Sequence, residues 1–244
     1  MAMLQDQRII LIGASGDLGL ALVRRFLDEG ASVHATAHRH PERLRPLAET
    51  ADGRLTISVL DVTSPEAMES ATTLLPDGWK PTAIVFNAGV TADSPILGME
   101  ETDWERVIDV NLNGAFRAAR TFGPLLFRQR SGRMLFVSSV AGRQGGRGQA
   151  NYAASKAGIE ALVRSLAAEM APRNVLVNAI APGPIASVMT RDVMAQAGEE
   201  LLRRIALRRL GKPEEIAAAA AHLLAPDMTF ATGQVFAVDG GFNL

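Results

Sequence analysis

The chain has 244 residues, a formal charge of −1 and no cysteine. This length suits one α/β domain with a full core, while the charge and the missing cysteines exclude a basic nucleic-acid-binding surface, disulfides and cysteine-held metals. No apolar run approaches the ~20 residues of a membrane span, and the polar N-terminus lacks a signal-peptide core. We therefore expect a cytoplasmic protein with no nucleic-acid and no membrane partner.

Short apolar runs alternate along the chain with amphipathic stretches. Strands are predicted at residues 8–13, 31–37, 54–61, 82–87, 133–139, 175–181 and 234–238. Helices are predicted at residues 17–30, 41–51, after 64, 100–130, 149–171 and 213–224, with a loop and one or two helices over 185–210. The 100–130 stretch is expected to be disturbed near Gly114 and at Pro124. Seven strands joined by helices predict an α/β fold with a parallel sheet covered on both faces.

A glycine-rich turn joins the first strand to the first helix. Glycines at this place let backbone N–H groups approach a phosphate at the helix N-terminus. The predicted phosphate-binding residues are Gly13, Ser15, Gly16, Asp17, Leu18 and Gly19. The alternative is a turn that serves only the packing of strand against helix.

The end of the second strand bears on which dinucleotide would bind. A fold that prefers NAD usually carries an acid there to hold the ribose hydroxyls, and none is present over residues 31–41. His38 and Arg39 instead offer positive charge to a 2′-phosphate, which favours NADP(H) as the cofactor over a merely solvated basic turn. The nearby histidines do not suggest a metal site, because His34 lies within a strand and no carboxylate adjoins the others.

The only tyrosine, Tyr152, stands four residues before Lys156, one of three lysines in the chain. On a helix both side chains point from one face, and an ammonium beside a phenol stabilises the phenolate, so the pair suits proton transfer. Ser138 and Ser139 end the fifth strand, where a serine can donate a hydrogen bond to a substrate carbonyl. The alternatives are an incidental contact on a solvated helix and a serine that satisfies a loop.

Several motifs together resemble the short-chain dehydrogenase/reductase family over nearly the whole chain. They are Gly13-x-x-Gly16-x-x-Gly19, Asp61-Val62, Asn87-Ala88-Gly89, Asn111, Ser139, Tyr152-x-x-x-Lys156 and Pro182-Gly183. The resemblance implies one Rossmann-type doubly wound domain over residues 1–244 that carries both the cofactor and the substrate sites. It also implies the strand order 3-2-1-4-5-6-7 and a homotetramer.

The resemblance assigns roles residue by residue. The implied catalytic residues are Asn111, which breaks a helix and holds a water, Ser139, which orients the carbonyl, Tyr152, the acid–base, and Lys156, which binds the ribose and lowers the pKa of the tyrosine. The implied cofactor residues beyond the loop, besides Tyr152 and Lys156, are His38, Arg39, Asp61, Val62, Asn87, Ala88, Gly89, Pro182, Gly183, Ile185 and Ser187. Two departures stand out: Gly16-Asp17 replaces the usual spacing of the loop glycines, and Phe86 replaces an asparagine.

Within the family the chain most resembles β-ketoacyl-acyl carrier protein reductases, through residues 89–93, 148–152 and 238–241. Arg130 and Arg173 match positions that present basic side chains to the acidic carrier protein, although both also suit ordinary helix ends. We therefore expect an NADPH-dependent reductase of 3-oxoacyl-acyl carrier protein or another small carbonyl substrate. The alternatives are a family member acting on a free alcohol or carbonyl, and a dinucleotide-binding sensor or partner subunit without turnover.

Overall fold

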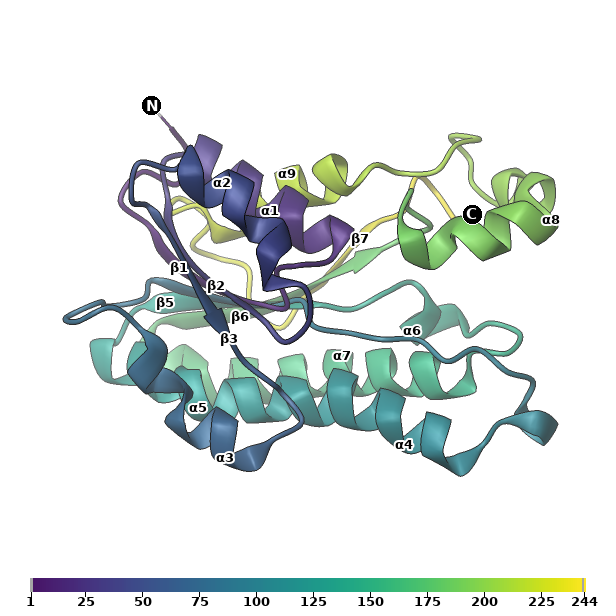
Figure 1. The fold of residues 1–244 in the computed structure, drawn as a ribbon, viewed down its shortest axis with the longest axis horizontal. Coiled ribbons are helices and arrows are strands. Elements are labelled where there is room, and N and C mark those ends of the chain that lie inside the picture. The colour runs from purple at the N-terminus through teal and green to yellow at the C-terminus, as the bar shows by residue number, and fades with distance from the viewer. Residues whose placement is uncertain (1, 243) are drawn as a thin grey trace.

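One sheet of seven parallel strands forms the middle layer of the molecule, in the order β3-β2-β1-β4-β5-β6-β7 (Figure 1). The computed structural model describes residues 2–242 and 244, and the backbone alone for residues 189 and 192–197. The strands are β1 (Arg8–Ile12), β2 (Ser32–Ala37), β3 (Leu55–Val59), β4 (Ala83–Phe86), β5 (Gly132–Val137), β6 (Val175–Pro182) and β7 (Val235–Val238). The predicted strand order is confirmed. It reverses between β1 and β4, which is where such sheets bind ligands.

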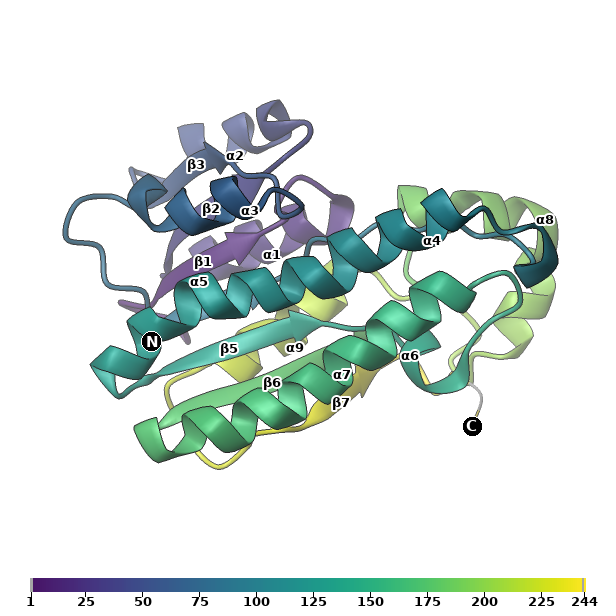
Figure 2. The same ribbon diagram turned by 90° about the horizontal axis from the view of Figure 1, so that it is seen from below.

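Helices cover both faces of this sheet. On one face lie α1 (Asp17–Asp28), α2 (Arg45–Glu49) and α9 (Pro213–Leu224); on the other lie α3 (Pro65–Ser70), α4 (Glu101–Ile108), α5 (Gly114–Gln129) and α7 (Ala150–Met170) (Figures 1 and 2). Two further helices, α6 (Ala141–Gln144) and α8 (Arg191–Arg203), lie beyond the carboxyl ends of the strands. The 3-10 turns are η1 (Pro41–Leu44), η2 (Ala71–Leu74), η3 (Ile96–Gly98), η5 (Ala171–Arg173) and η6 (Val188–Thr190).

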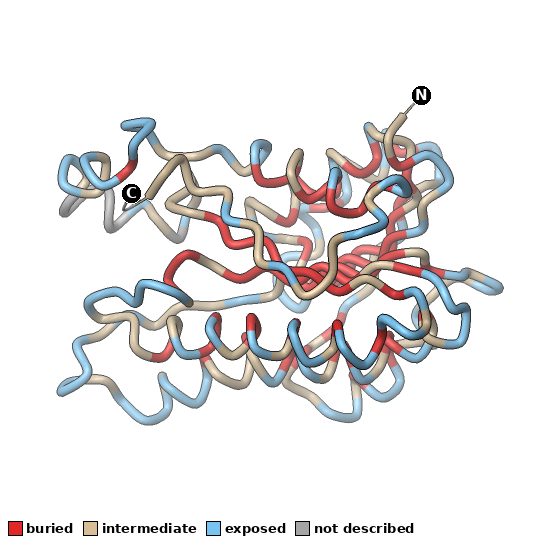
Figure 3. The backbone as a smooth tube through the Cα atoms, turned by 180° about the vertical axis from the view of Figure 1, so that it is seen from behind, coloured by how far each residue is buried: buried red, intermediate tan, exposed pale blue. Residues whose placement is uncertain are grey.

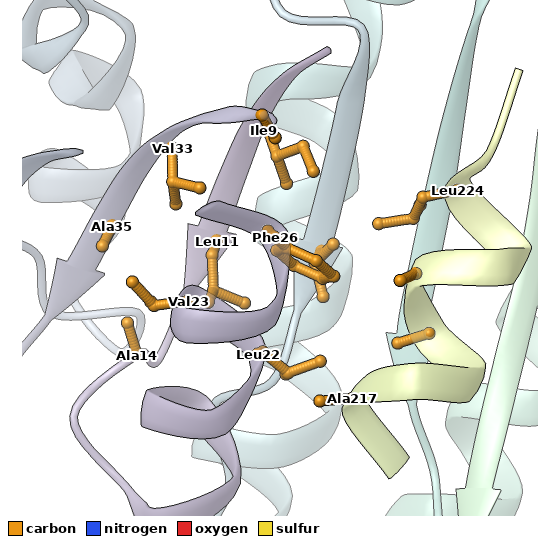
Figure 4. Close-up of a cluster of buried hydrophobic side chains, with 14 of the residues drawn as sticks. Ile9, Leu11, Ala14, Leu22, Val23, Phe26, Val33, Ala35, Ala217 and Leu224 are labelled. Atoms are coloured by element: carbon orange, nitrogen blue, oxygen red, sulfur yellow. The ribbon is translucent and has the colours of Figure 1, made fainter. Parts of the chain in front are cut away.

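The core consists of two apolar layers, one on each side of the sheet. Figure 3 shows that the strands and the sheet-facing sides of the helices are largely buried. The side chains of β1 alternate between them: Ile9 and Leu11 join the layer under α1 and α9, while Ile10 and Ile12 join the layer under α5 and α7. In the first layer Phe26 of α1 packs among β-strand residues and faces α9 (Figure 4). Burial of β1 on both faces explains its continuous apolar sequence.

Local signals in the sequence explain where several elements begin and end. The Ser64 hydroxyl accepts a hydrogen bond from the Ala67 N–H (3.1 Å) and so caps α3, with Pro65 at the first position. Gly30 follows α1 with φ +90°, a conformation that favours glycine. The segment after β2 was expected to be one helix and instead divides into η1 and α2, because Pro46 lacks the N–H that would continue the hydrogen-bond pattern.

The long helical stretch predicted at 100–130 is disturbed near Gly114, as expected, but continues through Pro124. A π-helical turn, η4 (Asp109–Asn113), separates α4 from α5. Gly114 opens α5 with helical φ (−58°) and is needed for packing, because a Cβ there would lie 3.0 Å from a methyl carbon of Val62. Pro124 lies inside α5 without ending it, since it is on the exposed side of the helix, where the freed carbonyl can bind water.

Candidate active site

The glycine turn between β1 and α1 has the properties of an anion-binding loop. Gly13 has φ +83°, and a Cβ there would lie 2.5 Å from the Cα of Ala88; a Cβ on Gly19 would lie 2.5 Å from the Ala14 carbonyl oxygen. A Cβ on Gly16 would meet nothing within 4 Å, so this part of the loop is open. Within the described part of the chain, no acceptor takes a hydrogen bond from the N–H groups of residues 16–19. Free N–H groups at a helix N-terminus fit the pyrophosphate of a dinucleotide.

Asp17, the acidic residue of this loop, is held by two donors. Its Oδ1 lies 2.9 Å from Nη2 of Arg43, and its Oδ2 accepts a hydrogen bond of 2.8 Å from the Val188 N–H. The bond from Val188 and the contact with Arg43 lower the pKa of Asp17, so the carboxylate is ionised at neutral pH. Asp17 therefore connects the loop to η1 on one side and to η6 on the other.

The predicted nucleoside-binding residues gather at the carboxyl ends of β2 and β3. Nε2 of His38 lies 3.6 Å from Oδ2 of Asp61, and the Ser15 hydroxyl donates to the Arg39 carbonyl (2.6 Å). Burial acts to raise the pKa of Asp61, but hydrogen bonds from Thr63 and nearby positive charge lower it on balance. The residues predicted for the adenine end of the cofactor therefore lie beside the phosphate loop.

The turn after β4 connects the loop to the predicted catalytic residues. Asn87 donates its Nδ2 hydrogen to the Gly13 carbonyl (2.6 Å), and Ala88 packs against Gly13. A Cβ on Gly89 would lie 3.4 Å from Oδ1 of Asn111 and 3.5 Å from Nζ of Lys156. All three residues of the predicted motif therefore lie along one path from the phosphate loop to the catalytic helix.

Asn111 stands in the π-helical turn and is fully buried. Its Oδ1 accepts from the Val90 N–H (2.8 Å), and its Nδ2 donates to the Val90 carbonyl and to the Ser155 hydroxyl (3.0 Å each). The helix break implied by the resemblance is thus present. The side chain itself is occupied in fixing the segment after Gly89, and its role in holding a water stays a prediction.

The two serines that end β5 point to different neighbours. The Ser138 hydroxyl donates to Oε1 of the buried Glu160 (3.1 Å) and lies 3.3 Å from the Lys156 carbonyl oxygen, so it binds β5 to α7. The Ser139 hydroxyl accepts from the Ala141 N–H (3.2 Å) and lies near enough to the phenol of Tyr152 to lower its pKa. Ser139, the serine chosen by spacing, is the one that meets Tyr152.

Tyr152 and Lys156 lie one turn apart on α7, with Nζ of Lys156 5.5 Å from the centroid of the tyrosine ring. Lys156 is buried and donates to the Val137 carbonyl (2.9 Å). Burial raises the pKa of Tyr152 to about 12, the Ser139 hydrogen bond opposes this, and the charge of Asp93 adds to it. Burial lowers the pKa of Lys156 to about 8. In this arrangement burial is the largest influence on the pKa of Tyr152, and the lowering of that pKa by Lys156 stays a prediction.

The segment after β6 lies across the phosphate loop. A Cβ on Gly183 would lie 2.6 Å from the Cα of Asp239, so this close crossing requires glycine. Ile185 pairs with Gly211, and Ser187 forms a capping box with Thr190 that starts η6. With Val188 bound to Asp17, the predicted residues from Pro182 to Ser187 lie beside the N-terminus of α1.

Contacts between distant segments add two groups that the motifs do not predict. Nε2 of Gln149 donates to Oδ2 of Asp93 (2.9 Å), and Nδ2 of Asn151 donates to the Ala92 carbonyl (2.9 Å), which fixes residues 92–93 against the start of α7. Arg43 is the second group, since it reaches the phosphate loop from η1. The only advance signal for Arg43 is the run of arginines after β2.

Arg130 and Arg173 lie near the amino-terminal ends of β5 and β6, whereas Tyr152 lies near the carboxyl ends of the strands. Arg130 is exposed after α5 with φ +56°, and the Arg173 guanidinium lies 4.6 Å from the ring centroid of Phe127. Tyr152 stands near the start of α7 and Arg173 beyond its end; the 21 residues of this helix span about 30 Å. The structure therefore does not bring the two arginines to the predicted catalytic residues.

Groups of acidic, histidine or cysteine side chains that could hold a metal are absent from the described residues. His34, the histidine within β2, is buried and its Nδ1 lies 2.8 Å from the Thr56 hydroxyl. Among the described residues, no helix is long and apolar enough to cross a membrane.

Comparisons with known proteins place these observations in a family. A family model described as enoyl-(acyl carrier protein) reductase matches residues 13–243. The chain is 38% identical over 241 residues to the 3-oxoacyl-[acyl-carrier-protein] reductase FabG of Thermotoga maritima, covering 98% of each chain. Two crystal structures titled 3-oxoacyl-[acyl-carrier protein] reductase, both from Brucella melitensis, superpose on it. One has a TM-score of 0.92 at 29% identity, covering 100% of this chain and 93% of that one. The other, with bound NAD, has a TM-score of 0.89 at 28% identity with the same coverage.

The match runs through the phosphate loop, the Asn111 turn and the Ser139, Tyr152 and Lys156 cluster described above. The chain is an oxidoreductase and belongs to the short-chain dehydrogenase/reductase family.

Proposed function

We propose that this protein reduces 3-oxoacyl thioesters, carried on acyl carrier protein, to the 3-hydroxyacyl form with NADPH. The observation that carries the proposal is the contact between the Ser139 hydroxyl and the Tyr152 phenol, next to a loop whose N–H groups suit a pyrophosphate. One domain over residues 1–244 would hold both cofactor and substrate. The relatives named as 3-oxoacyl-acyl carrier protein reductases support this substrate class.

In the proposed reaction the dinucleotide supplies a hydride to the ketone carbon. Ser139 donates a hydrogen bond to the ketone oxygen and orients it, and Tyr152 gives that oxygen its proton. Lys156 places an ammonium within 5.5 Å of the tyrosine ring centroid, where its charge favours the phenolate left behind. Asn111 keeps the backbone at Val90 in place beside them.

The choice of NADPH is supported by the end of β2. Ala37 stands where an acid would hold free ribose hydroxyls, and His38 and Arg39 follow it. The NAD in one of the Brucella melitensis structures is the observation that favours the alternative, NADH. A free carbonyl compound is the alternative substrate. The proximity of Ser139 to Tyr152 argues against the other alternative, a dinucleotide-binding sensor without turnover.

An assay of cofactor oxidation tests the proposal. Acetoacetyl thioesters, free ketones and a crotonyl thioester are offered with NADPH and with NADH. We expect the highest kcat/KM with acetoacetyl thioester and NADPH, and a loss of about 10²–10⁴-fold in kcat in the Tyr152→Phe variant with cofactor binding retained. Turnover of crotonyl thioester alone, a preference for free ketones, or full activity of Tyr152→Phe would overturn it.

Docking of the carrier protein at Arg130 and Arg173 is part of the proposal. Both residues lie near the amino-terminal ends of the strands, and Arg173 lies about 30 Å along α7 from Tyr152. In the proposed homotetramer, an acyl chain carried by a protein docked there would enter a neighbouring subunit. A cytoplasmic location stays a prediction.

The docking hypothesis is tested with the double variant Arg130→Glu, Arg173→Glu. We expect a raised KM for the acyl carrier protein substrate, with kcat and the turnover of a small acetoacetyl thioester unchanged. A control with the same charge change, Arg24→Glu and Arg45→Glu, alters exposed arginines on the opposite face. An equal effect of the two double variants would contradict specific docking.

A further inference from the structure

The phosphate loop has open space around Gly16, where a larger residue would fit. A Cβ on Gly16 would meet nothing within 4 Å, and Gly16 has φ −73°, which any residue can adopt. The loop itself, residues 13–19, contains no basic side chain. A cation that contacts a phosphate group at this place therefore has to come from another element.

Arg43 of η1 supplies such a cation. Its Nη1 donates to the Ser15 carbonyl (2.7 Å) and its Nη2 to Oδ1 of Asp17 (2.9 Å), so the guanidinium contacts the residues on both sides of Gly16. A guanidinium has five N–H donors, and these two bonds leave others available. The side chain is 42% exposed, which keeps it accessible to a ligand.

The loop that holds this guanidinium is bound to the end of β2. The Ser15 hydroxyl donates to the Arg39 carbonyl (2.6 Å), and the N–H groups of Gly13 and Ala14 donate to the Thr36 carbonyl (3.0 and 2.8 Å). These bonds bind the loop to the end of β2, where the 2′-position of a bound adenosine ribose is expected in this type of fold. Arg43 therefore contacts a loop that is itself bound to the end of β2.

Arg43 is better ordered for this role than the two basic residues that follow Ala37. Nε2 of His38 lies 3.6 Å from Asp61, so its ring is drawn toward the predicted base pocket. The Arg39 side chain has no hydrogen bond or ion pair to any described residue and would lose more freedom on binding. The Arg43 side chain is already fixed by two hydrogen bonds, and its planar guanidinium can donate two parallel hydrogen bonds to phosphate oxygens.

We propose that Arg43 recognises the adenosine 2′-phosphate of NADP(H), in place of a basic side chain on the loop. The inference rests on the proposed function, because it presupposes NADP(H) as the cofactor. Asp17 orients the guanidinium through one carboxylate oxygen, while its other oxygen is bound by Val188.

The test measures binding of adenosine 2′,5′-bisphosphate and of adenosine 5′-monophosphate by calorimetry, without catalysis. The variants are Arg43→Gln and, as a control, Arg45→Gln, an exposed arginine two residues further along. We expect Arg43→Gln to weaken bisphosphate binding roughly 10-fold, the lower end for a charged hydrogen bond because the side chain is half exposed, and to leave monophosphate binding unchanged. The Arg45→Gln variant should bind both like the wild type.

Each other outcome has one meaning. Equal weakening for both nucleotides would show that Arg43 only shapes the loop, and no change for either would assign the 2′-phosphate to His38 and Arg39; both results overturn the inference and leave the proposed cofactor standing. A wild-type protein that binds the bisphosphate no better than the monophosphate would overturn the NADPH assignment itself, and this inference with it.

Discussion

The ionisation of Tyr152 can be measured directly, because it is the only tyrosine in the chain. Burial raises its pKa from 10.0 to about 12, which corresponds to about 2.7 kcal/mol against the phenolate. At pH 11 the folded protein should therefore carry about one-tenth phenolate, whereas an unperturbed tyrosine would carry about nine-tenths. Ultraviolet absorbance of the phenolate, recorded with circular dichroism to confirm folding, gives this fraction.

Variants test the cause of the shift. Asp93→Asn removes the charge that adds to it and should lower the pKa of Tyr152, while Ser139→Ala removes an opposing hydrogen bond and should raise it. Asp77→Asn, at an exposed site on another loop, is the control. Half-ionisation near pH 10 in protein that is still folded would refute the reasoning, because burial would then not control the phenol. Since the unfolded chain ionises first, the protein should also lose stability as pH rises from 10 toward 12.

Three further predictions concern stability and cofactor choice. Burial lowers the pKa of His34 from 6.5 to about 4, so the free energy of unfolding should fall by up to about 3 kcal/mol as pH drops from 6.5 to 4. In urea titrations the His34→Val variant should show a weaker dependence on pH. An equally steep fall in the variant would exclude His34 as the cause. Gly13→Ala should lower the free energy of unfolding by about 1–3 kcal/mol, because of backbone strain and a clash with Ala88. Gly16→Ala, at a position with open space, should leave the free energy of unfolding in urea unchanged. Equal losses in the two variants would contradict the loop geometry. Ala37→Asp should shift the ratio of kcat/KM toward NADH, and an unchanged ratio would mean that the end of β2 does not select the cofactor.

The features that the sequence predicts well are those set by neighbouring residues. Ser64 before Pro65 caps a helix, and the continuous apolar run of β1 reports burial on both faces, whatever the rest of the chain does. The spacing of Tyr152 and Lys156 likewise places them one turn apart on a helix. These local rules give the strand order only together with the family resemblance.

The features that the sequence misses depend on contacts between distant segments. Asp17 meets Val188, 171 residues away, and Arg43 meets Ser15 across 28 residues. The pKa of Tyr152 depends on how deeply α7 is buried, which spacing along one helix cannot give. The disturbance predicted near Gly114 is present at residues 109–113, but Gly114 itself is helical, because its packing against Val62 outweighs the low helix propensity of glycine.

The π-helical turn at residues 109–113 is equivalent to a one-residue insertion in the helix that runs from α4 into α5. Deleting one residue there would restore regular α-helical hydrogen bonding without turning either flanking helix away from its partners. The shortened helix would gain backbone stability, but Asn111 would no longer face Val90 and Ser155. Deleting this residue would therefore stabilise the helix but displace Asn111 from the predicted active site. Selection for activity would then keep the less stable, π-helical form.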